Sequence, residues 1–228
     1  MIPPAGFAPY DSLATALLPF ALLGADRHDG AHDGAHLLRV WHNAFALVAL
    51  EGGERDVIAA AVLLHDCVCV EKNSPDRPRA STLAAARAGE ILNGMGWAEA
   101  RVQAVTHAIA AHSFSAGIAP QTLEARILQD ADRLDAIGAI GVARCFYTAG
   151  RMGSQLYNPA DPRALHRPLD DAAFAIDHFR SKLLKLNAGF QTDSGRAMAG
   201  ERTRRIAEFL TLFETEIGAF GEGDPALD

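Results

Sequence analysis

The sequence contains little cysteine, and its cysteines do not form a recognisable framework. Three cysteines occur among 228 residues, namely Cys67, Cys69 and Cys145, and the first two form a CxC pattern with no second pair. This arrangement fits neither a disulfide scaffold nor a four-thiolate zinc site. We therefore expect reduced cysteines that serve as packing residues.

Positive charge and aromatic residues are also scarce. Lys and Arg number 21 against 28 Asp and Glu, which gives a formal charge of −7, and aromatic residues make up 7% of the chain. A nucleic-acid surface needs basic residues to neutralise phosphates and often needs aromatic residues for base stacking. The composition therefore predicts no nucleic-acid partner, although it is compatible with a local basic pocket.

Long hydrophobic runs are absent as well. The longest apolar run near the N-terminus, residues 13–25, is interrupted by Pro19, and no Lys or Arg precedes it. It resembles neither a membrane-spanning helix nor a secretory signal. We expect no membrane partner and a cytoplasmic location.

The residues that are abundant predict an all-α fold. Hydrophobic residues make up 49% of the chain, and in segments such as 56–65 and 176–186 they recur at helical spacing, whereas alternating β-branched runs are scarce. The length and the lack of a Pro/Gly-rich linker favour a single domain. Breaking residues delimit helices at 36–50, 54–69, 81–93, 97–112, 121–149 (as one helix or two), 170–186 and 195–217, with a long loop at 151–168.

A histidine–aspartate doublet follows an apolar helical segment. His65 and Asp66 end the string AAAVLLHD. Adjacent helical residues differ in direction by about 100°, so both side chains can converge on one cation at the helix end. Taken alone, the doublet is equally consistent with a buried histidine beside a capping aspartate.

An acidic run, QDADRLD at 129–135, precedes an apolar segment that must be internal. Asp130 and Asp132 point about 200° apart on a helix, so only one of them can face a shared site, whereas Asp132 and Asp135 share a face. The alternative is a solvated helix start, with Asp130 near the N-terminal dipole and Asp132 paired with Arg133.

A third pattern places an imidazole, a guanidinium and an amide on one helical face. In HDGAHLLRV, Arg39 follows His36 by three residues, and Asn43 follows His36 by seven. Because arginine suits bidentate phosphate contact, this pattern predicts a phosphate site beside a cation. The upstream histidines His28 and His32 remain alternatives to His36 as a ligand.

Taken in order, His36, the pair His65-Asp66 and Asp132 resemble the H…HD…D signature of the HD-domain metal-dependent phosphohydrolase superfamily. The strings HDGAHLLRV, AAAVLLHD, AIAAHSF and LQDADRLDAIGAIGVAR resemble its single-domain bacterial, nucleotide pyrophosphohydrolase-like branch over residues 26–151. The resemblance implies an all-helical core with the C-terminal helices, 170–217, packed on it. It also implies that these four residues bind one divalent cation, and it selects Asp132 over Asp130.

Two departures narrow the implied activity. Cys67-Val68-Cys69 stands where the cyclic-dinucleotide-cleaving branch has Gly-Lys, and the Glu-Asp pair of the alarmone-hydrolysing branch is absent at the expected place.

His107 and His112 lie five residues apart, about 140° around a helix, so they are not expected to share one ion. We expect His112 at the site and His107 in packing.

The implied ligand set predicts the chemistry. Two imidazoles and two carboxylates leave two positions open on an octahedral ion, which suits Mn²⁺ or Mg²⁺, with Co²⁺ or Fe²⁺ as alternatives. Asp66 is the expected proton acceptor for the attacking water, with His112 as the alternative. The expected phosphate contacts are Arg39, Lys72 and, if its helix is unbroken, Arg144; further candidates are Asn43, Asp135, Tyr147 and Arg151, of which the last two would cover a nucleobase.

The leading hypothesis is therefore a phosphohydrolase of small nucleotides, and more narrowly one that releases pyrophosphate from a nucleoside triphosphate. The expected partner is a small-molecule nucleotide or phosphate ester. The alternatives are a nucleoside monophosphate phosphatase and a non-catalytic metal- or nucleotide-binding regulatory module. Apolar helical faces serve a core and an interface equally well, so a homo-oligomer stays open.

Overall fold

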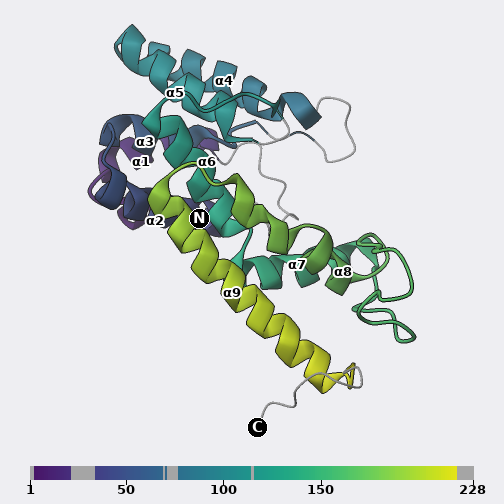
Figure 1. Ribbon diagram of the computed structural model, residues 1–228. Coiled ribbons are helices and arrows are strands. Elements are labelled where there is room, and N and C mark those ends of the chain that lie inside the picture. Colours follow the sequence, from purple (N-terminus) through teal and green to yellow (C-terminus); the bar gives the residue numbers. More distant parts are fainter. Residues whose placement is uncertain (1–2, 22–33, 69, 71–76, 114–115, 220–228) are drawn as a thin grey trace. The chain divides into compact units, whose positions relative to one another are not determined.

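The computed structural model describes residues 3–21, 34–68, 70, 77–113 and 116–219, and these residues form helices and loops with no strand (Figure 1). The all-α prediction is confirmed. No helix in this part of the chain combines the length and the apolar character needed to cross a membrane.

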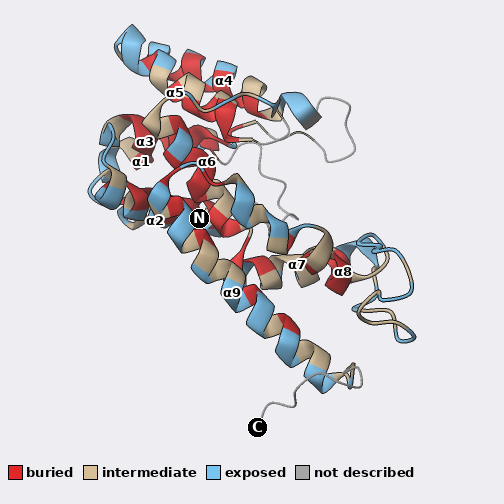
Figure 2. Ribbon diagram, in the orientation of Figure 1, coloured by how far each residue is buried: buried red, intermediate tan, exposed pale blue. Residues whose placement is uncertain are grey.

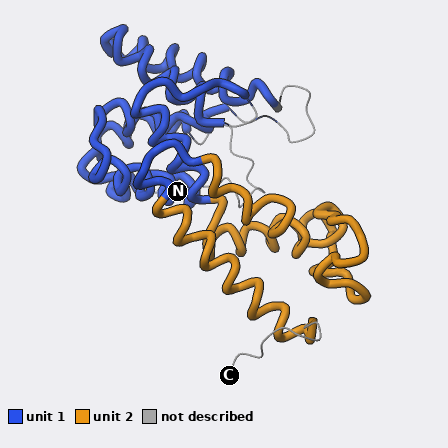
Figure 3. Tube along the Cα trace, viewed as in Figure 1, with its two compact units in different colours: residues 1–135, 190–196 blue, residues 136–189, 197–228 orange. Residues whose placement is uncertain are grey.

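The chain forms two compact units (Figure 3). Unit 1 comprises residues 1–135 and 190–196, and unit 2 comprises residues 136–189 and 197–228. The helices of unit 1 are η1 (Pro4–Phe7), α1 (Asp11–Ala21), α2 (Gly34–Glu51), α3 (Arg55–Leu64), η2 (Arg77–Arg79), α4 (Ala80–Gly94), α5 (Glu99–His112) and α6 (Leu123–Asp135). Unit 2 contains α7 (Gly138–Met152), α8 (Ala175–Ser181), η4 (Leu183–Gly189) and most of α9 (Asp193–Glu216), whose first turn belongs to unit 1. The single-domain organisation stays a prediction.

The segment 121–149 is two helices rather than one. The break follows Asp135, and α7 starts at Gly138 with a φ of +73°, a backbone conformation that favours glycine. A Cβ at Gly141 would lie 2.4 Å from the carbonyl oxygen of Ala136, so only glycine allows the chain to approach itself there.

Pro19 lies inside α1, a helix that the breaking residues alone did not predict.

Helix α3 forms the centre of unit 1. Its residues from Val57 to Leu64 are all buried, and it packs against α1, α2, α5 and α6 (Figure 2). A helix that is apolar on every side must be internal, because it has no face to offer to water. The His65-Asp66 doublet follows this helix directly, so His65 is buried in unit 1 while Asp66 remains open to solvent.

Two cysteines are free thiols with packing roles. Cys67 is buried and its Sγ donates to the carbonyl oxygen of Ala84 at 3.5 Å, while Cys145 is half-buried. Burial raises the pKa of both thiols to about 11, which keeps them protonated and unreactive at neutral pH. The prediction of reduced packing cysteines agrees with this; Cys69 lies outside the described residues.

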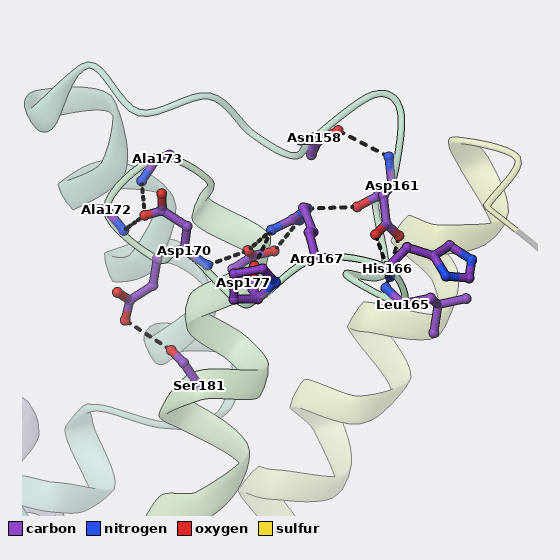
Figure 4. A network of polar contacts seen from close by, with 12 residues as sticks. Asn158, Asp161, Leu165, His166, Arg167, Asp170, Ala172, Ala173, Asp177 and Ser181 are labelled. Carbon is purple, nitrogen blue, oxygen red and sulfur yellow. Dashed lines mark hydrogen bonds and ion pairs between the residues drawn. The ribbon is translucent and has the colours of Figure 1, made fainter.

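Unit 2 has an aromatic core and a long ordered loop. Phe146 of α7 packs against Phe179 of α8, and against Phe209 and Phe213 of α9, with ring centroids 5.7–6.0 Å apart. The loop predicted at 151–168 runs from 153 to 174, because α7 extends to Met152 and the helix predicted at 170–186 begins only at Ala175. Arg167 makes two hydrogen bonds to the buried carboxylate of Asp177, and the loop's aspartates accept backbone N–H groups (Figure 4).

The beginning of α9 is anchored on α6 within unit 1. The buried carboxylate of Asp130 accepts hydrogen bonds from the N–H of Gln191, from the N–H of Thr192 and from the Thr192 hydroxyl, each at 2.8 Å. Thr192 Oγ1 in turn accepts from the N–H of Gly195 at 2.9 Å and caps the helix. Burial raises the pKa of Asp130, against the opposing effect of these hydrogen bonds.

We predict that Thr192→Ala lowers the free energy of unfolding by about 1–3 kcal/mol, because it removes a helix cap and leaves the buried Asp130 with one donor fewer. Urea unfolding followed by circular dichroism measures the change. Thr211→Ala is the control, since the exposed Thr211 hydroxyl bonds only within its own helix. Equal stability of the two variants would contradict the anchoring role.

Candidate metal centre

Side chains from the ends of three helices of unit 1 meet at one point. His36 lies in the first turn of α2, His65 caps the C-terminal end of α3 with Asp66 next to it, and Asp132 lies in the last turn of α6. His36 Nε2 lies 3.5 Å from Asp132 Oδ1 and 3.7 Å from Asp66 Oδ2, and His65 Nε2 lies 3.5 Å from Asp66 Oδ2. One ligand atom from each of His36, His65 and Asp132 lies within 4.8 Å of the others.

The hydrogen bonds of the imidazoles determine which nitrogen faces this point. His65 Nδ1 lies 2.8 Å from the carbonyl oxygen of Val62, and His36 Nδ1 lies 2.8 Å from Asp135 Oδ2. A carbonyl or carboxylate oxygen only accepts, so Nδ1 carries the proton and donates it in both rings. Nε2 of each ring is therefore the nitrogen directed at the carboxylates of Asp66 and Asp132.

This arrangement fits a divalent cation. His65 Nε2 is buried and makes no hydrogen bond to any described residue, which is unfavourable for a polar atom unless a ligand satisfies it. Metal–ligand bonds of about 2.1 Å place neighbouring ligand atoms about 3–4.2 Å apart, and the observed separations of 3.5–3.7 Å fall in that range. The nitrogens are buried, while the Asp66 and Asp132 side chains are 46% and 30% exposed, so the centre is open to solvent on its carboxylate side.

The two buried histidines differ in how their surroundings treat a positive charge. Burial lowers the pKa of His65, which keeps its imidazole in the neutral form that binds metals. Burial also opposes protonation of His36, but its hydrogen bond with Asp135 and the charges of Asp132 and Asp66 outweigh this effect and raise the pKa of His36. The Asp132 and Asp66 carboxylates that favour a proton on His36 are also groups that attract a cation.

His112 lies beside the centre, whereas His107 does not. The Nε2 of His112, the last residue of α5, is 3.8 Å from Asp66 Oδ1, and its Nδ1 donates to the carbonyl oxygen of Ile109 at 2.7 Å. His107 Nε2 instead accepts the N–H of Gln121 at 3.0 Å. The two histidines therefore have different contacts, and the role of His112 at the centre stays a prediction.

Other candidates lie at the contact between α2 and α6. Arg39 donates from Nε to Asp135 Oδ1 at 2.5 Å and from Nη2 to Asp135 Oδ2 at 3.0 Å, and Asn43 donates to the carbonyl oxygen of Ala131 at 3.0 Å. Sequence reasoning had placed Arg39 on a phosphate. It missed the pairing of Arg39 with Asp135 because the two residues are 96 positions apart in the chain.

Three of the remaining candidates belong to the other unit. Arg144, Tyr147 and Arg151 belong to α7 of unit 2, where Arg151 Cζ lies 5.8 Å from the centre of the Tyr147 ring. The spacing argument that linked Arg144 to Asp132 required an unbroken helix, and the break before Gly138 removes that argument. Three further candidates lie outside the described residues: His28, His32 and Lys72.

The HD domain family model matches residues 34–137, a range that contains the whole cluster. The chain is also 33% identical over 190 residues to the uncharacterized protein YpgQ of Bacillus subtilis (strain 168), a match that covers 82% of this chain and 84% of YpgQ.

Solved structures resemble the chain over nearly its full length. An HD-superfamily hydrolase from Bacillus thuringiensis has a TM-score of 0.71 at 30% identity, with 92% of this chain and 98% of the other covered. Bacillus subtilis YpgQ in complex with ADP has a TM-score of 0.67 at 29% identity, with 90% and 93% covered. On the evidence of the motif, the cluster and these similarities, the chain belongs to the HD-domain superfamily of hydrolases.

Proposed function

We propose that this protein is a divalent-metal-dependent phosphohydrolase that acts on small nucleotides. The observation that carries the proposal is the convergence of the Nε2 atoms of His36 and His65 with a carboxylate oxygen of Asp132. The Asp66 carboxylate lies beside this group, 3.5 Å from His65 Nε2 and 3.7 Å from His36 Nε2. The nitrogens are buried, whereas both carboxylates are open to solvent. A closed structural site would bury all of its ligands, whereas a catalytic site must admit water and substrate.

His36, His65, Asp66 and Asp132 would hold the cation. Two nitrogen and two oxygen donors without a thiolate suit Mn²⁺ or Mg²⁺, with Co²⁺ and Fe²⁺ as alternatives. When bound, the cation supplies charge neutralisation at the phosphoryl group and lowers the pKa of a water molecule.

Asp66 and His112 would handle the protons. Asp66 is the most exposed of the four ligands and accepts the proton of the attacking water through a carboxylate oxygen. His112 is the alternative acceptor, because its Nε2 lies 3.8 Å from Asp66 Oδ1 while its Nδ1 is held by the Ile109 carbonyl.

More narrowly, we propose that the substrate is a nucleoside triphosphate and the leaving group is pyrophosphate. Water attacks the α-phosphorus, the bond between this phosphorus and the α–β bridging oxygen breaks, and the products are a nucleoside monophosphate, pyrophosphate and a proton. The resemblance to the pyrophosphohydrolase-like branch supports this reaction, and the ADP held by the similar YpgQ supports a nucleotide as the ligand. Lys72 and Arg144 stay predictions as phosphate contacts, as do Tyr147 and Arg151 beside the base, whereas the guanidinium of Arg39 makes a bidentate pair with Asp135.

Phosphorus NMR of a mixed nucleotide pool tests the reaction. We expect pyrophosphate to appear when Mn²⁺ is added to demetallated protein and not to appear without metal, because the cation neutralises the developing charge. Release of orthophosphate from monophosphates would replace the narrower proposal with a phosphatase. The absence of any product from protein that binds Mn²⁺ would favour a regulatory module.

Removal of a ligand tests the assignment of the site. We expect His65→Ala and Asp132→Ala to remain folded, to lose bound metal and to turn over at least about 100-fold more slowly. The reason is that the cation would stabilise the transition state by several kcal/mol. Metal analysis and steady-state kinetics measure the two effects. The control is His42→Ala on the exposed side of α2, which should retain both properties; unchanged turnover in the two ligand variants would refute the site.

A further inference from the structure

A buried carboxylate joins the metal centre to Arg39. The side chain of Asp135 is 1% exposed, and its Oδ2 accepts the Nδ1–H of His36 at 2.8 Å. The same carboxylate receives two hydrogen bonds from the Arg39 guanidinium, at 2.5 and 3.0 Å. Arg39, Asp135 and His36 therefore form a continuous chain of contacts that ends at the cluster.

The position of His36 in its helix explains why it needs a partner of this kind. His65 and His112 lie at the C-terminal ends of their helices, and each donates its Nδ1–H to the carbonyl oxygen three residues earlier. The last carbonyls of a helix lack intrahelical partners and are available for this bond. His36 lies in the first turn of α2, where the unsatisfied backbone groups are N–H donors, so its acceptor must come from another helix.

The position of Asp135 disfavours a carboxylate, so its presence there is explained by the side chains to which it bonds. It is the last residue of α6, where the helix dipole disfavours a negative charge, and it is removed from water. Arg39 offsets both effects with a bidentate, charge-assisted pair. Without the guanidinium, the carboxylate would stay buried and would lose its bidentate cationic partner.

We propose that Arg39 and Asp135 are positioning residues for His36. Arg39 holds the Asp135 carboxylate in place. Asp135 in turn orients the His36 ring, so that Nδ1–H points at Asp135 and Nε2 points at the cation. The inference rests on the proposed metal-dependent function. In this inference Arg39 acts through Asp135 on His36, a proposed ligand of the metal. The sequence pattern predicts instead that Arg39 contacts the phosphate.

Asp135→Asn is the sharpest variant. An amide offers one acceptor oxygen where the carboxylate offers two, so its NH₂ group must face either the N–H of His36 or the guanidinium of Arg39. We expect the affinity for Mn²⁺ to fall about 10- to 100-fold, the range found when partners of metal ligands are replaced. Arg39→Lys should give a smaller loss in the same direction, because an ammonium group keeps the charge but loses the bidentate geometry.

Asp130→Asn is the matched control. It makes the same chemical change in the same helix at another buried position, but Asp130 bonds to the 191–192 backbone and to the Thr192 hydroxyl. Its affinity for Mn²⁺ should equal that of the wild type, even if its stability is lower. An equal loss in Asp130→Asn and Asp135→Asn would show general damage to α6 and would overturn the inference.

Isothermal titration of the demetallated full chain with Mn²⁺ measures these affinities, and steady-state kinetics at saturating Mn²⁺ adds a second measure. We expect Arg39→Lys to recover kcat at saturating metal with an unchanged nucleotide KM. Wild-type metal affinity together with a raised KM would make Arg39 a phosphate contact and overturn the positioning role.

The outcomes separate this inference from the proposed function. A wild-type protein that binds none of Mn²⁺, Mg²⁺, Co²⁺ and Fe²⁺ refutes both. A wild-type protein that binds Mn²⁺ while Asp135→Asn and Arg39→Lys match it refutes only the inference. If Asp135→Asn fails to fold, Arg39→Lys decides, because the Arg39 side chain is 28% exposed and can be replaced without opening the core.

Discussion

The histidines of the centre are buried, and a buried imidazole must satisfy both of its ring nitrogens. In His36, His65 and His112, Nδ1 is bound to a protein oxygen, which leaves Nε2 directed at the carboxylates. The arrangement of unit 1 follows from this constraint, because each helix has to end or begin where its histidine finds an acceptor. Two helices supply that acceptor from their own last carbonyls, and the third obtains it from α6.

A centre with buried nitrogens and exposed oxygens has consequences for both binding and chemistry. Burial lowers the pKa of His65 and so keeps a neutral nitrogen ready for a metal ion. The exposed carboxylates of Asp66 and Asp132 place negative charge on the open side of the centre. In the proposed activity, a bound cation would offset the repulsion between those carboxylates and an anionic substrate, which is why that activity depends on metal.

Three aspartates of α6, Asp130, Asp132 and Asp135, point in different directions and make different contacts. Asp130 faces the start of α9 and holds it through backbone N–H groups, Asp132 faces the centre, and Asp135 faces α2. Their directions follow from helical geometry, since two residues turn the side chain through about 200° and five through about 500°. One acidic run therefore anchors a helix, supplies a carboxylate to the candidate metal centre and bonds to both His36 and Arg39.

The sequence alone determined the all-helical class, the residues of the cluster and the family. Periodicity and breaking residues report local backbone preference, and the spacing of His36, His65-Asp66 and Asp132 is a linear pattern that the chain displays directly. The tertiary structure alone decided what each polar group contacts: that Asp130 holds α9, that the helix breaks before Gly138, and that Arg39 binds Asp135. These pairings join residues far apart in the chain, and they depend on burial, which only the packed helices create.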